Sequence, residues 1–132
     1  MKERNTSTFR RWNPNPFGNR VEDCVQRAIA AALGVSWGEA SDIIHDVAKE
    51  IGFPEHSDVV WGAVLRRAGF RRAIIPNTCP NWFTVRDFCL DHPRGVYVLK
   101  TPEHVVCVSS GRAWDTWDSS GEVPQYFWYR RD

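Results

Sequence analysis

The first half of the chain carries apolar residues at helical spacing. One stripe at positions i, i+3, i+4, i+7 and i+8 predicts a helix that begins near Asp23 and Cys24 and ends at Gly34, where glycine favours a left-handed C-cap. The stripe consists of Val25, Ala28, Ile29, Ala32 and Leu33. The segment Ser36–Glu39 has the capping-box pattern of a second helix, which Gly52 ends.

Two further helices and a strand are expected in the next 40 residues or so. A third helix should start at Ser57 or Asp58 and end before Gly69. The segment Phe70–Ile75 is typical of a short strand. A fourth, shorter helix is predicted from Thr84, because an acidic residue three positions later completes another capping box.

After Gly95 the apolar period changes to two residues, which is typical of β-strands. Short turns containing Pro, Ser and Gly divide this region, so we expect an antiparallel meander. Its four strands should cover residues 96–100, 104–109, 112–117 and 123–129. Helices followed by a meander predict an α+β fold, in which N-terminal helices pack on a C-terminal antiparallel sheet.

Length and composition indicate one domain. The chain has 132 residues, of which 42% are hydrophobic and 25% are charged, and these values are typical of a globular protein. Residues 1–19 are polar and rich in turn-forming Asn, Pro and Gly. We therefore expect a loose N-terminal arm at residues 1–19 and a single domain at residues 20–132.

Charge and hydropathy narrow the class of protein. The net charge is +1, from 17 Lys and Arg against 16 Asp and Glu, which argues against binding to nucleic acid by phosphate neutralisation. No apolar segment approaches the roughly 20 residues of a membrane span. The first 19 residues contain no secretory signal. We therefore expect a cytoplasmic protein with no membrane partner.

The cysteine spacing fits neither a disulfide framework nor a zinc site. A chain that is not exported keeps its thiols reduced, and no two cysteines have the CxxC spacing of zinc ribbons. The four cysteines are Cys24, Cys79, Cys89 and Cys107. We expect buried structural thiols, room for one reactive thiol, and no metal or organic cofactor.

Cys24 lies where the first helix should begin, a position that suits a reactive thiol. Helix N–H groups and the macrodipole favour the thiolate, whereas the adjacent charges of Glu22 and Asp23 would raise the thiol pKa. Asp23 could ease this conflict as the N-cap, with its carboxylate turned onto backbone N–H groups. The alternative is that Cys24 is simply a small buried apolar residue.

A two-residue hairpin turn at Ser110-Gly111 would bring a carboxylate beside His104. In that register Val106 faces Asp115, so Asp115 lies diagonal to His104, roughly 7–8 Å away between Cβ atoms. An Asp side chain can cross this gap and orient the imidazole. A three-residue loop with a bulge would shift the register and favour another residue.

Cys24, His104 and Asp115 therefore form a candidate catalytic triad of nucleophile, general base and orienting carboxylate. Such a triad attacks an acyl carbon and forms a thioester intermediate. The oxyanion of this reaction needs hydrogen-bond donors. We expect the Cys24 backbone N–H to be one donor and the side-chain amide of Asn19 to be the other.

The sequence around these residues resembles the papain-like cysteine peptidase superfamily, especially small bacterial and phage members related to the C39-type bacteriocin-processing peptidases. The similar segments are Arg20–Ala30, Glu103–Val108 and Gly111–Asp118. The resemblance implies a papain-like fold and a thiol peptidase that acts on a protein or peptide. It also implies that Cys24 is the nucleophile, His104 the general base and acid, and Asp115 the orienting residue.

The chain departs from this family at the expected oxyanion amide. Family members usually supply the amide from a Gln a few residues before the Cys, and no Gln lies between Met1 and Cys24. Asn19 or Asn13 would have to take its place.

Other functions stay open on the sequence alone. Papain-like sites also serve deamidases and acyl transferases, because an amine can resolve a thioester as well as water can. The missing upstream Gln also fits a catalytically inert binding module. An Arg-rich interface for nucleic acid or an acidic protein is a further alternative, since arginine outnumbers lysine 14 to 3.

Overall fold

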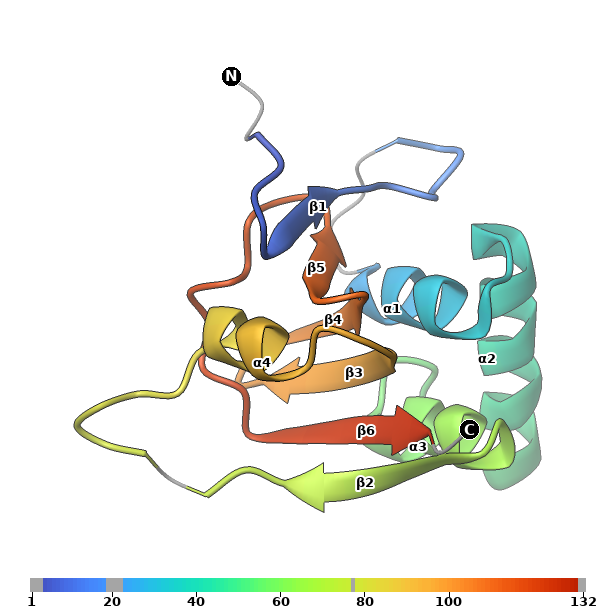
Figure 1. The fold of residues 1–132 in the computed structure, drawn as a ribbon. Helices are drawn as coiled ribbons and strands as arrows, with labels where there is room; N and C mark the ends of the chain where they lie inside the picture. The colour runs from blue at the N-terminus through green and yellow to red at the C-terminus, as the bar shows by residue number, and fades with distance from the viewer. Residues whose placement is uncertain (1–3, 19–22, 77, 131–132) are drawn as a thin grey trace.

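The computed structural model describes residues 4–18, 23–76 and 78–130 and shows, within them, four helices packed on a six-stranded sheet (Figure 1). The helices are α1 (Cys24–Leu33), α2 (Trp37–Ile51), α3 (Asp58–Arg67) and α4 (Val85–Asp91). The strands are β1 (Phe9–Arg11), β2 (Phe70–Ile74), β3 (Val96–Thr101), β4 (His104–Ser109), β5 (Arg112–Asp115) and β6 (Tyr126–Arg130). This is the α+β class that the change of period predicts.

Local sequence signals account for the helix boundaries. Ser36 caps α2 and Thr84 caps α4, and both helices have the complete capping box. Ser57 begins α3 by accepting a hydrogen bond from the N–H of Val60 at 3.3 Å. Gly34 ends α1 in the left-handed conformation, with φ of 68°. The four predicted helices are confirmed.

The strand order is β1-β5-β4-β3-β6-β2, which differs from the predicted meander. β3, β4 and β5 pair consecutively and antiparallel, as predicted. β6, however, pairs with β3 and β2, so the chain crosses the sheet after β5. The meander prediction was wrong at this last step because β1 occupies the other edge of β5.

Residues 9–11 form a strand, although the sequence predicts only turns in this segment. β1 runs parallel to β5, which makes the sheet mixed, and Arg11 lies opposite Asp115. The side chain of Phe9 is completely buried. The turn prediction was wrong here because three residues are too few to show a strand period and their partner strand lies at the far end of the chain.

The helices form layers on both faces of the sheet (Figure 1). The first three helices share one hydrophobic core with sheet residues Val98, Val105, Cys107 and Trp128. α4 belongs to a second core, which includes sheet residues Leu99, Val106, Val108 and Ala113. The central strand β4 is therefore buried on both faces.

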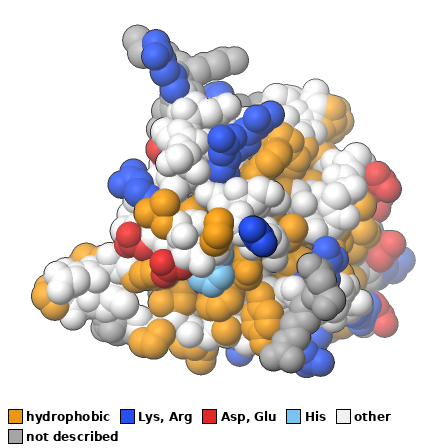
Figure 2. Space-filling model, viewed as in Figure 1, with side chains coloured by type: hydrophobic (Ala, Val, Ile, Leu, Met, Phe, Trp, Pro, Cys, Tyr) orange, Lys and Arg blue, Asp and Glu red, His pale blue; other side chains and the backbone are white. Residues whose placement is uncertain are grey.

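Basic side chains do not form one patch on the face of the molecule that Figure 2 shows. Figure 2 shows Lys and Arg side chains scattered over this face among apolar ones. Ile74 on β2 and Leu90 on α4 are among the most exposed large apolar residues, at 77% and 63%. Across the described ranges, no helix combines the length and apolarity needed to cross a bilayer.

Candidate active site

Cys24 is the first residue of α1, and Asp23 occupies the N-cap position. The Asp23 carboxylate does not cap the helix, contrary to the sequence-based expectation. It instead accepts hydrogen bonds from Asn15 Nδ2 at 2.9 Å, from Trp37 Nε1 at 3.2 Å and from the guanidinium of Arg27. The carboxylate is thus neutralised by a buried cation, and the first turn of α1 has no side-chain cap.

His104 and Asp115 meet as the hairpin register predicts. Ser109 lies opposite Arg112, so the turn contains only Ser110 and Gly111, and both residues have positive φ values of 53° and 74°. These values are typical of the type I′ turn that suits the twist of a hairpin. His104 Nε2 lies 2.6 Å from Asp115 Oδ2 in a buried environment.

Asp115 is held by three further groups that sequence reasoning missed. Its Oδ2 accepts a hydrogen bond from Ser119 Oγ at 2.7 Å. Its Oδ1 accepts one from the Thr116 N–H at 2.8 Å and one from Arg27 Nη2 at 3.4 Å. The spacing of Arg27 four residues after Asp23 could have indicated their ion pair, but nothing in the sequence links Arg27 to Asp115.

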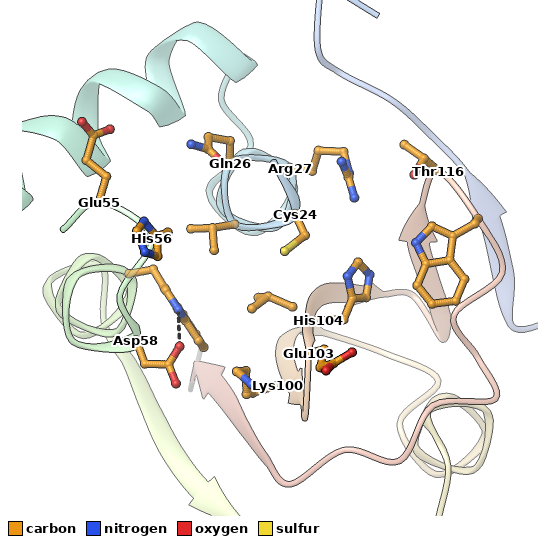
Figure 3. A pocket seen from close by; sticks show the side chains of 14 residues that line it. Cys24, Gln26, Arg27, Glu55, His56, Asp58, Lys100, Glu103, His104 and Thr116 are labelled. Atoms are coloured by element: carbon orange, nitrogen blue, oxygen red, sulfur yellow. Dashed lines mark hydrogen bonds between the residues drawn. The ribbon is translucent and has the colours of Figure 1, made fainter. Parts of the chain in front are cut away.

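Cys24 and His104 face each other at the start of α1 (Figure 3), and their pKa values move in opposite directions. Burial raises the pKa of Cys24, but hydrogen bonds with His104 and the Val105 backbone, together with the charge of His104, lower it below 9.0. Burial lowers the pKa of His104, but Asp115 and Cys24 raise it from 6.5 to about 9. Since Nε2 of His104 faces Asp115, its Nδ1 is left to serve the thiol. The pair is therefore shifted toward thiolate and imidazolium, compared with the free side chains.

The pair opens into a pocket of about 840 Å³. Figure 3 shows the Cys24 thiol pointing from α1 toward the His104 ring. The Trp117 ring lies beside this imidazole, with centroids 5.0 Å apart, and also lines the pocket. The remaining wall includes Gln26, His56, Asp58, Lys100 and Glu103. The thiol is thus accessible from the pocket, while Asp115 stays buried behind the imidazole.

The other cysteines lie in different environments. Burial raises the pKa values of Cys89 and Cys107 to about 12, so both thiols stay protonated at neutral pH. Cys79 is exposed. Of the four cysteines, Cys24 is the one that lines the pocket, and all four are free of disulfides.

Neither of the side-chain amides predicted to bind the oxyanion is placed at the site by the described residues. Asn19 lies outside the described residues. Asn13 is exposed, and its Oδ1 accepts a hydrogen bond from the Asn15 N–H at 3.0 Å. Asn15 is buried, and its amide is already bound to Asp23. The Cys24 backbone N–H, at the uncapped start of α1, is therefore the donor that the described residues support.

Several arginines that could form a basic interface instead lie over aromatic rings. The distances from guanidinium carbon to ring centroid are 4.9–5.4 Å. The pairs are Arg10 with Trp114, Arg66 with Trp128, Arg72 with Tyr126 and Arg130 with Phe70. These cation–π contacts give the arginines a packing role. Three of the pairs lie together on α3, β2 and β6, and the fourth lies on β1 and β5.

Among the described residues, no group of three or more His, Cys, Asp and Glu side chains is arranged to hold a metal ion. Compared with protein-family models, with curated proteins and with solved structures, the chain has no significant match. The function is therefore inferred from the geometry of the site.

Proposed function

We propose that this protein is a papain-like cysteine hydrolase that cleaves a peptide or isopeptide bond through Cys24, His104 and Asp115. The observation that carries the proposal is the alignment of these three side chains from α1, β4 and β5: Cys24 and His104 line one pocket, and Asp115 binds His104 from behind. The proposal is supported by the chain order of the triad, with the thiol on a helix and the His and Asp on later adjacent strands. This order is the one that the resemblance to papain-like peptidases implies.

In the first half of the reaction, the Cys24 thiolate attacks the carbonyl carbon and forms the C–S bond. The carbonyl electrons move to oxygen, and the Cys24 N–H donates a hydrogen bond to the resulting oxyanion. As the oxyanion collapses, the C–N bond breaks and the amine takes the proton from the His104 imidazolium. The products are a thioester at Cys24 and a free amine.

In the second half, neutral His104 takes a proton from water, and the hydroxide attacks the thioester. Collapse of the second oxyanion breaks the C–S bond and releases a carboxylic acid. The thiolate and imidazolium are then restored. Throughout the cycle the Asp115 carboxylate orients the ring and stabilises its charged form.

The first experiment is the pH dependence of iodoacetamide alkylation at Cys24, measured by peptide mass spectrometry. Wild type and His104→Ala are compared, and exposed Cys79 in the same samples reports changes in reagent reactivity. We expect fast alkylation of Cys24 well below pH 8 in wild type, because the imidazolium stabilises the thiolate. This advantage should disappear in His104→Ala.

The proposal is wrong if wild-type Cys24 titrates like an ordinary thiol near pH ~8.5 whether or not His104 is present. A positive result is followed by incubation with a peptide library and a search for new termini. Cys24→Ser, which keeps the size of the side chain, is the inactive control for cleavage.

A further inference from the structure

Arg27 is a buried cation that links the start of α1 to the proposed triad. The residue is 6% exposed, and its guanidinium binds the carboxylates of both Asp23 and Asp115. Burying a charge is costly unless it is paired, and an apolar residue on this helix could pack here without that cost. We therefore expect Arg27 to do more than fill space in the core.

We propose that Arg27 is a positioning residue that holds the Asp115 carboxylate, and through it the His104 imidazole, opposite Cys24. This inference rests on the function proposed above. It concerns which group sets the geometry of the triad, and it assigns Arg27 no contact with substrate.

The two oxygens of Asp115 are used differently. Oδ1 accepts hydrogen bonds from Arg27 and from the Thr116 N–H. Oδ2 accepts those from His104 and Ser119. Because Arg27 and the backbone occupy one oxygen, the carboxylate cannot rotate freely, and the other oxygen stays directed at the imidazole.

Arg27 is itself fixed from the other side. It binds Asp23, which also accepts hydrogen bonds from Asn15 in the N-terminal segment and from Trp37 in α2. Arg27 lies three residues after Cys24 on α1, so the two side chains lie on one side of the helix. The helix that presents the thiol thus also holds the carboxylate that orients the base.

The charge of Arg27 has a second consequence for the thiol. The negative charge of Asp115 raises the pKa of Cys24, against the larger lowering by His104 and Val105. Without Arg27, less positive charge would offset the charge of Asp115, and its effect on the thiol pKa would be larger. The other charged or titratable side chains of the pocket are Glu55, His56, Asp58, Lys100 and Glu103, and all of them are unchanged in the variants below.

The test repeats the alkylation series with Arg27→Met and Arg27→Lys. In Arg27→Met, we expect the pH midpoint for Cys24 to rise by about one unit, and alkylation at pH 6 to slow by about tenfold. Arg27→Lys keeps the positive charge but lacks the planar guanidinium that can bind two carboxylates. Its Cys24 midpoint should therefore lie between those of wild type and Arg27→Met. The matched control is Arg67→Met, which removes an exposed ion pair between Arg67 on α3 and Glu50 on α2 and should leave the midpoint unchanged.

A merely structural role would lower the melting temperature of Arg27→Met and leave its Cys24 midpoint at the wild-type value, and this result would overturn the inference. If Arg27→Met does not fold, the double variant Asp23→Asn with Arg27→Met removes one charge of each sign and is measured instead, with the same expectation. The pH midpoint of Cys24 in the wild-type protein distinguishes a failure of the proposed function from a failure of the proposed role of Arg27. An ordinary wild-type midpoint rejects the function itself, whereas an activated wild type with an unchanged Arg27→Met rejects only the role of Arg27.

Discussion

At the scale of single residues, His104 connects the stability of the fold with its proposed chemistry. Its ring is buried, lies 2.6 Å from Asp115 and contacts Cys24. The pKa of His104 is raised from 6.5 to about 9, so the folded protein holds the proton more tightly than the unfolded chain does. Protonated His104 therefore stabilises the fold fully below pH 6.5, and this contribution is lost as the pH rises through the folded pKa.

This pH dependence can be isolated in Cys24→Ala, which removes the opposing titration of the thiol. Asp115 still raises the pKa of His104 in this variant, whereas the contribution of Cys24 is lost. We therefore expect the melting temperature to fall as the pH rises above 6.5, by roughly 4 °C, since a loss of about 1 kcal/mol shifts a domain of this size by that amount. The measurement is thermal unfolding followed by circular dichroism. Adding His104→Gln should flatten the curve between these pH values, and a curve that keeps its slope would contradict the assignment.

At the scale of elements, the β4–β5 hairpin decides where the carboxylate stands. The two-residue turn pairs Ser109 with Arg112 and brings Asp115 to His104. A one-residue slip would move Asp115 to the other face of the sheet. The turn needs positive φ at both central residues, and Gly111 adopts it at low cost, whereas Ser110 is the one non-glycine residue with positive φ in the described part of the chain.

Substitutions at the two residues of this turn should change the stability of the protein in opposite directions. Ser110→Asn should stabilise the protein by about 0.5 kcal/mol, because Asn tolerates the left-handed conformation better. Gly111→Ala should destabilise it by at least about 1–2 kcal/mol, since a Cβ there would also lie 3.2 Å from Pro93 Cα.

The free energy of unfolding in urea measures both effects. Gly121→Ala is the control, because a Cβ at Gly121 meets no atom within 4 Å and this residue lacks a positive φ. Equal effects of the alanine substitutions at Gly111 and Gly121 would show that the turn does not limit the hairpin.

At the scale of the whole molecule, the N-terminal segment contacts both β5, which lies about 100 residues further along the chain, and the start of α1. β1 pairs with β5, and the Trp12 N–H donates a hydrogen bond to the Asp115 carbonyl at 2.8 Å. Asn15 then reaches Asp23 beside Cys24. The N-terminal segment therefore supports both the strand that carries the carboxylate and the start of the helix that carries the thiol.

Phe9→Ala tests this support. The Phe9 side chain is completely buried, so its truncation should cost about 3–5 kcal/mol of folding free energy. Release of β1 should also slow the alkylation of Cys24 near neutral pH, because β5 loses its edge partner. Phe17→Ala is the control, since Phe17 is 69% exposed and its loss should cost well under 1 kcal/mol. If Phe9→Ala unfolds no more easily than Phe17→Ala, β1 is not part of the folded sheet.

The sequence by itself determined the features that depend on neighbours along the chain. Helix boundaries follow from residues such as Ser36, Thr84 and Gly34, whose side chains or φ values act within one turn. The alternation of β4 and the two-residue turn likewise placed Asp115 beside His104, because a tight turn fixes the hairpin register.

Only the tertiary structure decided the contacts between distant segments. It placed β1 on β5, moved β6 to the far side of β3, turned the Asp23 carboxylate away from its own helix, and brought Arg27 to Asp115 across 88 residues of chain. No local period encodes such contacts. They depend on which sheet edges are free and which buried charges need a partner, and both conditions exist only once the helices and the sheet have packed together.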